Sequence, residues 1–307
     1  MLQRTPYDKG RETSVAHGRE FAGHGYVAVY QDVRAPYASD GELKMGFFSA
    51  DHHDAEDGHD TVEWAAALPW SNGRVGTFGS SYAGWTQWAM AHTRPPHLVT
   101  MIPGMIAADL LERELSGVLR LGRVLTWCAQ NLSVDTRARA NAPGPKTLAE
   151  AERLFQERDR EKWLSFLPPA ELPEEALHGV RPLWLEWLRN HTVDTFRFLE
   201  RHGEVDVPVL SITAWYDQQI GTIKHFTGMS QNGMTEEART WQRLIIGPWT
   251  HGYQFGTRTG RVDFGPEAQR DYVEICLQWF DYWLKEKKDN AVRGWPPIQP
   301  FVMGANR

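Results

Sequence analysis

The sequence predicts an α/β fold in which helices cover a mostly parallel sheet. Two observations carry this prediction: short apolar runs rich in β-branched residues recur along the chain, and longer amphipathic stretches separate them. Small or turn-forming residues follow each run, as they do where a strand ends. We expect strands at residues 26–30, 74–78, 98–102, 207–213 and 243–246.

The amphipathic stretches between these runs predict the covering helices. The last stretch has apolar residues at Val273, Cys276, Phe280 and Leu284, which matches the helical period of about 3.6 residues. We expect helices at residues 60–68, 84–92, 218–229 and 267–285.

Residues 107–204 interrupt this alternation. The segment has helical patterns rich in Leu, Arg and Glu, and a proline-containing hinge near residues 141–146, but no convincing strand. Ligands of open α/β sheets bind outside the carboxyl ends of the strands, so an insertion that leaves the sheet there would cover the site. We therefore predict a first part of the core (residues 1–106), a helical cap (107–204) and a second part of the core (205–290).

The charge balance favours a small, roughly neutral substrate. The 307 residues include 33 basic and 39 acidic side chains, which give a net charge of −6 without a long run of either sign. Neither nucleic acid nor a membrane is therefore predicted as a partner. No stretch approaches the roughly 20 apolar residues that span a bilayer, and the first residues lack a signal-peptide core. We expect a soluble, cytoplasmic protein, provided that Met1 is its true start.

The cysteines and the tryptophans are two further residue types that bear on function. Cys128 and Cys276 lie far apart and have no metal-binding spacing, so we expect buried, inert thiols. The chain also has 14 tryptophans, which either pack in the core or line an aromatic pocket for an acyl group. The candidate substrate-binding residues are Trp85, Trp127, Trp215 and Gln219.

Residues 79–84 combine the features of a nucleophile elbow, a tight turn that leads from a strand into a helix. Ser81 lies at its centre, with small residues, Gly79 and Ala83, two positions away on either side. Larger side chains there would collide with the adjoining strand and helix. The backbone N–H of Tyr82 then lies at the helix N-terminus, where it can point at a developing oxyanion.

A serine needs a base to act as a nucleophile, and a third group orients that base. His251 follows the predicted strand at 243–246, and Asp217 follows the one at 207–213. The chain order of Ser81, Asp217 and His251 is that of α/β-hydrolases. We therefore predict an α/β-hydrolase fold with Ser81 as nucleophile, His251 as general base and Asp217 as the orienting acid. This chemistry implies no metal and no organic cofactor.

Residues 51–60 offer a rival site because they are dense in His, Asp and Glu, which are common metal ligands. However, no helix or strand register brings these side chains together. The acids directly precede a predicted helix, where they cap its N-terminus and oppose its dipole. We favour the capping interpretation over a metal site.

Short motifs of a more specific kind are spread over nearly the whole chain outside the cap. They are RTPYDK at residues 4–9, QDVR at 31–34, ASDG at 38–41, WSNGRVG at 70–76, GSSYAG at 79–84, WYD at 215–217, GPWTH at 247–251, DFGP at 263–266 and WFDYWLK at 279–285. Together these motifs resemble the cocaine-esterase/X-prolyl dipeptidyl-peptidase-like hydrolases, often called CocE/NonD.

The resemblance implies serine hydrolysis of esters or amides through an acyl-enzyme, a helical cap and a C-terminal jelly-roll domain. It also implies an oxyanion hole formed by the Tyr82 N–H and the phenol of Tyr7. The family's opening strands would precede Arg4, and its jelly roll would follow an apparent strand at 301–303. We therefore expect a partial chain, longer at both ends in the native product, in which residues 291–307 form a linker and the start of a truncated β domain.

One departure from the family bears on the substrate. Members that hydrolyse α-amino-acid esters place acidic residues just after the catalytic aspartate, whereas this chain has Gln219 and Ile220. We therefore predict a serine hydrolase of small acyl esters or amides that needs no free α-amino group. The sequence indicates no oligomeric state.

Two alternatives remain. An X-Pro dipeptidyl-peptidase would need an ammonium-binding carboxylate from the cap, where the candidates are Asp109, Glu112 and Glu114, and these residues otherwise belong to a solvated helix. A non-catalytic fragment that retains the three residues without a competent fold is the other alternative.

Overall fold

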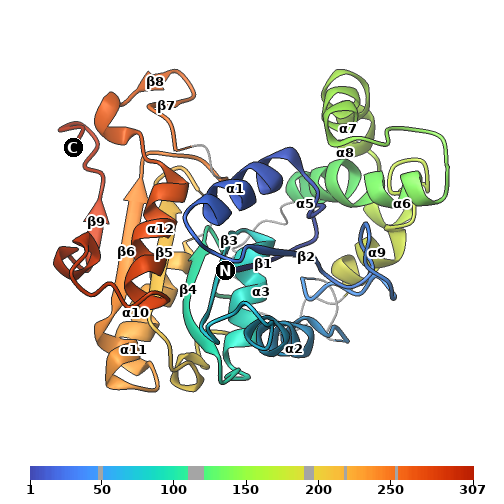
Figure 1. The fold of residues 1–307 in the computed structure, drawn as a ribbon. Helices are drawn as coiled ribbons and strands as arrows, with labels where there is room; N and C mark the ends of the chain where they lie inside the picture. The colour runs from blue at the N-terminus through green and yellow to red at the C-terminus, as the bar shows by residue number, and fades with distance from the viewer. Residues whose placement is uncertain (48–50, 110–120, 190–196, 218–219, 253–254) are drawn as a thin grey trace.

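The computed structural model describes residues 1–47, 51–109, 121–189, 197–217, 220–252 and 255–307. Within them, seven strands form one sheet in the order β2-β1-β3-β4-β5-β6-β9, and every neighbouring pair is parallel (Figure 1). Their bounds are Leu2–Thr5 (β1), Val29–Asp32 (β2), Val75–Ser80 (β3), Leu98–Gly104 (β4), Val209–Ala214 (β5), Gln242–Gly247 (β6) and Ile298–Pro300 (β9). A separate antiparallel ribbon joins β7 (Arg258–Thr259) to β8 (Val262–Asp263).

Helices cover both faces of this sheet, as the unbroken burial of β3, β5 and β6 requires. On one face, α1 (Glu12–Gly23) and α12 (Tyr272–Trp283) lie against each other (Figure 1). α2 (Asp54–Ala66), α3 (Tyr82–Ala91) and α10 (Gly221–Asn232) cover the other face, with the short α11 (Glu236–Thr240) packed beside α10.

The packing of α12 explains why the WSNGRVG motif ends in glycine. A Cβ atom on Gly76 of β3 would lie 2.4 Å from the Phe280 ring, so only glycine lets the helix approach the strand this closely. Asp271 caps the helix, because its carboxylate accepts hydrogen bonds from the N–H groups of Val273 and Glu274. Cys276, on the buried side of α12, is a free thiol whose pKa is raised by burial, and Cys128 is also buried and free.

The predicted cap contains only helical elements among its described residues. They are α5 (Leu121–Trp127), a π-helix at Cys128–Leu132, α6 (Ser133–Arg139), α7 (Leu148–Leu154), a second π-helix at Phe155–Asp159, α8 (Arg160–Leu164), a 3₁₀ turn at Pro169–Glu171 and α9 (Arg181–Arg189). Its core, which includes Leu125, Trp163 and Trp184, is continuous with the apolar cluster under α3.

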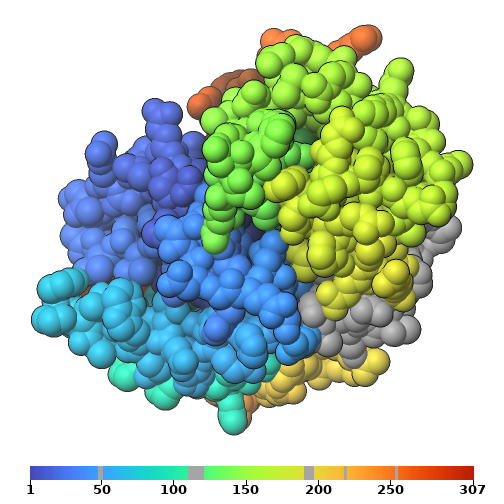
Figure 2. Space-filling model, turned by 90° about the vertical axis from the view of Figure 1, so that its right-hand side faces the viewer, coloured from blue at the N-terminus to red at the C-terminus, as the bar shows by residue number. Residues whose placement is uncertain are grey.

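In Figure 2 these cap residues, coloured green to yellow, pack directly beside the blue N-terminal residues. Two hydrogen bonds join the cap to the loop after β2: the Tyr37 N–H donates to the Asp135 carboxylate, and Arg139 donates to the carbonyl of Ala35. Ala35 has a positive φ of 80°, a conformation that glycine adopts more easily. Among the described residues, no helix is both long and apolar enough to cross a membrane.

The structure confirms the five predicted strands, with shifts of up to three residues at their ends. At the ends of the chain the structure differs from the sequence analysis. Residues 2–5 and 12–23 form β1 and α1, elements that the sequence analysis did not predict. The strand predicted at 301–303 is wrong: the strand is β9 at 298–300, and it joins the main sheet beside β6.

Candidate active site

The turn between β3 and α3 has the geometry of a nucleophile elbow. Ser81 has φ 58° and ψ −126°, a left-handed conformation that is rare for a residue other than glycine. A Cβ atom on Gly79 would lie 2.6 Å from the Cβ of Ala83, and one on Gly84 would lie 2.8 Å from the carbonyl oxygen of Gly104. The small residues of the motif are therefore required by the close approach of helix and strand.

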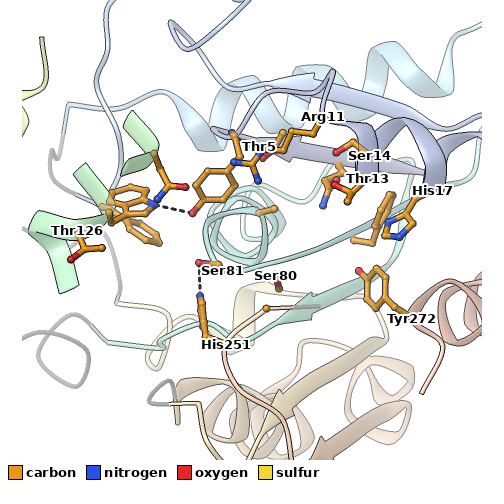
Figure 3. A pocket seen from close by; sticks show the side chains of 18 of the residues that line it. Thr5, Arg11, Thr13, Ser14, His17, Ser80, Ser81, Thr126, His251 and Tyr272 are labelled. Atoms are coloured by element: carbon orange, nitrogen blue, oxygen red, sulfur yellow. Dashed lines mark hydrogen bonds between the residues drawn. The ribbon is translucent and has the colours of Figure 1, made fainter. Parts of the chain in front are cut away.

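The structure brings the three predicted triad side chains together. His251 Nε2 lies 2.9 Å from Ser81 Oγ (Figure 3). On the other side of the ring, His251 Nδ1 lies 3.0 Å from the carboxylate of Asp217. Each residue follows the carboxyl end of its strand, β3, β5 or β6, and these ends meet at one edge of the sheet. The Asp217 side chain is fully buried, whereas the His251 side chain is 31% exposed, so the imidazole remains open to substrate and water.

The two tyrosines predicted for the oxyanion hole have different geometries. Tyr82 is the first residue of α3, where backbone N–H groups have no partner within the helix. Its side chain points away into the core and donates a 2.7 Å hydrogen bond to Asp54, and burial together with this carboxylate raises the pKa of the phenol. Only the backbone of Tyr82 is therefore available to an oxyanion.

Tyr7, in contrast, presents its phenol to the same cavity as Ser81 and His251. The Tyr7 hydroxyl accepts a 3.2 Å hydrogen bond from Trp127 Nε1, and the two rings meet edge to face. A hydroxyl that accepts one hydrogen bond keeps its own proton to donate. The indole of Trp127, which comes from the cap, therefore orients the Tyr7 hydroxyl as a donor.

The cavity at the triad has a volume of about 800 Å³. Its described lining residues come from the start of the chain, the elbow, α5 and the loop after β6. One side carries Arg11, Thr13, Ser14 and His17 of the α1 region, and the opposite side carries Thr126 of the cap (Figure 3). The sequence analysis missed the α1 side because it did not predict that helix.

The four residues predicted to bind substrate differ in where they lie relative to the cavity. Trp127 lines the cavity. Trp85 does not: it is a fully buried residue of α3 that packs against Phe47 and Tyr82, so its prediction is wrong. Trp215 is not among the described residues that line the cavity, and its indole N–H donates to the Phe301 carbonyl beside β9. Gln219 lies outside the described residues, as do Glu112 and Glu114, whereas Asp109 is described but does not line the cavity.

The His- and Asp-rich segment at 51–60 begins α2. Asp54, in the first turn of α2, is buried and accepts the hydrogen bond from Tyr82, while its backbone carbonyl accepts one from Arg4. No group of three or more His, Cys, Asp or Glu side chains is arranged to hold a metal ion within the part of the chain that the structure describes.

Comparison with known proteins assigns the chain to a family. Residues 1–253 match the X-Pro dipeptidyl-peptidase (S15) family. The chain belongs to this family. This match confirms the predicted resemblance to CocE/NonD hydrolases. A solved structure of such a hydrolase shares the fold.

Two curated proteins are similar to this S15-family chain over almost all its length. The cocaine esterase of Rhodococcus sp. (strain MB1 Bresler) is 30% identical over 99% of this chain and 53% of its own length. A putative serine esterase of Mycobacterium bovis (strain ATCC BAA-935 / AF2122/97) is 23% identical over 100% of this chain and 51% of its own length. The chain thus spans about half the length of the curated relatives it matches.

Solved structures confirm the α/β-hydrolase fold of the S15-family chain. An α-amino acid ester hydrolase superposes with a TM-score of 0.68 at 22% identity, covering 100% of this chain and 52% of that protein. An aminopeptidase from a marine sediment archaeon, Thaumarchaeota archaeon, gives 0.66 at 21% identity, with 100% and 52% covered. A CocE/NonD family hydrolase of Staphylococcus aureus gives 0.56 at 22% identity, with 97% and 47% covered.

Proposed function

We propose that the protein is a serine hydrolase that cleaves small acyl esters or amides through an acyl-enzyme. The observation that carries the proposal is the continuous hydrogen-bonded chain from Ser81 through His251 to Asp217 at the wall of a cavity. A serine in a strained elbow, a histidine within reach of its hydroxyl and a buried acid behind that histidine are the arrangement that nucleophilic acyl transfer needs.

In the proposed reaction, Ser81 Oγ attacks the acyl carbon while His251 Nε2 takes its proton. Asp217 accepts a hydrogen bond from His251 Nδ1 and stabilises the imidazolium that forms. The backbone N–H of Tyr82 and the hydroxyl of Tyr7 donate to the tetrahedral oxyanion. His251 then gives its proton to the leaving group, and water removes the acyl group from Ser81 by the same route.

Active-site substitutions test this proposal. Ser81→Ala and His251→Ala should each lower kcat for an acyl ester by on the order of 10³-fold or more, and the double variant should be little worse than either, because the residues act as a unit. Ser80→Ala, one residue away on the same turn, is the matched control and should lose far less activity. Labelling by a fluorophosphonate probe that survives Ser81→Ala would contradict the proposed nucleophile.

The family match favours one second candidate, an X-Pro dipeptidyl-peptidase. Such an enzyme binds the ammonium of its substrate, yet none of the described residues that line the cavity is Asp or Glu. We therefore rank ester or simple amide hydrolysis first. A panel of acyl esters against aminoacyl-proline amides separates the two activities, and a chain that hydrolyses neither, and is not labelled at Ser81, would be a non-catalytic fragment.

A further inference from the structure

The described lining of the active-site cavity contains two arginines in a chain that is acidic as a whole. The net charge of the chain is −6. The described residues that line the cavity nevertheless include Arg11 and Arg123, and no Asp or Glu. A cavity whose charges have one sign concentrates ligands of the opposite sign, because its low-dielectric walls focus the field. The lining therefore favours an anionic substrate over a cationic one.

The guanidinium group of Arg11 lacks an acidic partner among the described residues. Among the described residues, no carboxylate forms an ion pair with Arg11, and its buried Nε has no hydrogen-bond partner. The acids nearest to Arg11 in the sequence have other surroundings. Asp8 accepts a hydrogen bond from the Gly10 N–H, and Glu12 is exposed. A buried donor without a partner costs free energy. A ligand that accepts a hydrogen bond from this guanidinium would remove that cost.

The position of Arg11 links it to the reacting atoms. Its guanidinium carbon lies 5.0 Å from the centroid of the Tyr7 ring, whose hydroxyl is proposed to hold the oxyanion. Thr13 and Ser14 lie along the same side of the cavity as Arg11, facing the region of Ser81 and His251 (Figure 3). Their hydroxyls add neutral donors beside the fork of guanidinium N–H groups, which matches a planar carboxylate.

We propose that this side of the cavity binds a carboxylate of the substrate, with Arg11 as the residue that determines this specificity. The inference rests on the proposed function: the preferred substrates of the serine hydrolase are esters or amides that carry a free carboxylate. A simpler role for Arg11 is to stack on Tyr7 and hold its phenol in place. The two roles differ in a measurable way, because a positioning residue affects charged and neutral substrates alike.

Two pairs of esters separate these roles and locate the carboxylate. Mono-4-nitrophenyl glutarate and its neutral methyl ester differ in the charge of the acyl part. 4-Acetoxybenzoate and its methyl ester differ in the charge of the leaving group, and intrinsic differences in reactivity within each pair cancel when the ratio is compared between protein variants. For each pair, the ratio of kcat/KM for the charged ester to kcat/KM for the neutral ester is measured after subtraction of the uncatalysed rate, in the wild type, Arg11→Met, Arg11→Lys and Arg19→Met.

We expect the wild type to prefer the charged member of at least one pair. Arg11→Met should lower that ratio by roughly 10- to 100-fold, the usual effect of losing a hydrogen bond to a charged group. Arg11→Lys should retain part of the ratio, because it keeps the charge but not the fork. Arg19→Met removes a charge from the exposed side of the same helix and is the matched control, with a ratio close to that of the wild type.

The inference is overturned if Arg11→Met lowers kcat/KM for both members of each pair equally, or if it leaves the ratio unchanged while thermal melting shows a folded variant. Failure of the proposed function looks different: the wild type would hydrolyse no ester and Ser81 would not be labelled by a fluorophosphonate. Calorimetric titration of Ser81→Ala with glutarate then tests the carboxylate site without turnover. Binding that disappears when Arg11→Met is added supports the site, and equal or absent binding overturns it.

Discussion

At the scale of single residues, the hydrogen bond between Tyr7 and Trp127 joins the core to the cap at the proposed oxyanion donor. Tyr7 follows β1, whereas Trp127, whose indole N–H donates to its hydroxyl, ends α5 more than a hundred positions later. The core therefore supplies the proposed oxyanion donor and the cap orients it. This division predicts that the two side chains contribute to the same step by different amounts.

Tyr7→Phe should lower kcat by roughly 10²–10³-fold, the usual loss for one oxyanion donor, with little change in KM, because the hydroxyl strengthens its contact only when the oxyanion forms. Trp127→Phe keeps an aromatic ring but removes the orienting N–H, and it should cause a smaller loss. Steady-state kinetics on one neutral acyl ester measure both. A Tyr7→Phe variant with wild-type kcat would remove Tyr7 from the proposed site.

At the scale of elements, the elbow depends on the approach of α3 to β3. Gly79 has φ +140°, and a methyl group there would meet the Cβ of Ala83 at 2.6 Å. Gly79→Ala should therefore lower the free energy of unfolding by about 1–3 kcal/mol and lower kcat as well, because Ser81 would shift. Ala83→Gly should recover part of the loss by removing the opposing methyl group. Full stability and activity in Gly79→Ala would show that the contact is not tight.

A second element-scale feature joins the cap to the core through two histidines. His202, in the 3₁₀ turn His202–Glu204 that leads back into the core, lies 3.0 Å by its Nε2 from Nδ1 of His225 on α10. The His225 ring stacks on Trp88 of α3 at 4.0 Å. Burial lowers the pKa of His202 to about 4, against the pull of a hydrogen bond with the Leu199 backbone, and burial lowers that of His225 well below its usual range.

These lowered pKa values predict that acid destabilises the fold. In the unfolded chain a histidine takes up a proton as the pH falls through about 6.5, whereas folded His202 does so only near pH 4. The unfolded state therefore binds more protons in this window, and His202 alone should lower the free energy of unfolding by up to about 3 kcal/mol between pH 6.5 and 4. Denaturant melts at several pH values measure it.

His202→Asn is the comparison for this titration. Carboxylates also protonate toward pH 4, but they do so in both proteins, so the difference between variant and wild type isolates the histidine. The variant should be less stable at pH 8 and should lose less stability on acidification. Identical pH slopes for the two proteins would show that His202 does not remain neutral in the fold.

At the scale of the whole molecule, the proposed substrate class rests on the side chains that the described cavity lining contains. Ile220, at a position where relatives that bind an ammonium group were expected to carry an acid, is 51% exposed and apolar. Neither Ile220 nor the described residues that line the cavity include an acid that could pair with a protonated amine, which would lose hydration and gain little in return.

Acetyl or benzoyl esters should therefore be hydrolysed at least as well as matched α-aminoacyl esters. Comparison of kcat/KM for each pair near pH 7, where the amine is charged, measures this preference. A preference of more than about tenfold for the free-amino ester, about 1.4 kcal/mol, would require a carboxylate at the site and would contradict the substrate class proposed above.

The central strands could be predicted from the sequence, because a strand buried on both faces is a continuous apolar run. The first and the last strand of the sheet along the chain, β1 and β9, could not. β1 contains Gln3, Arg4 and Thr5, polar residues that are nevertheless buried. The partners of the Arg4 side chain include Gln31, Asp54 and Asp57, all distant in the sequence. β9 is three residues long, includes Pro300 and is recognised only by its pairing with β6. Both strands depend on partners that lie far away in the chain.

By itself, the sequence determined the fold class and the three residues at the centre of the candidate site, because a nucleophile elbow, an acid and a histidine after successive strands are local patterns with one topological outcome. Only the tertiary structure decided which tryptophan faces the cavity, which stays in the core, and which charges line the walls. Trp85 and Trp127 look alike in the sequence. Trp85 packs from α3 into the core, whereas Trp127 donates a hydrogen bond to Tyr7. Exposure to a cavity is a property of packing between distant segments, and no local pattern encodes it.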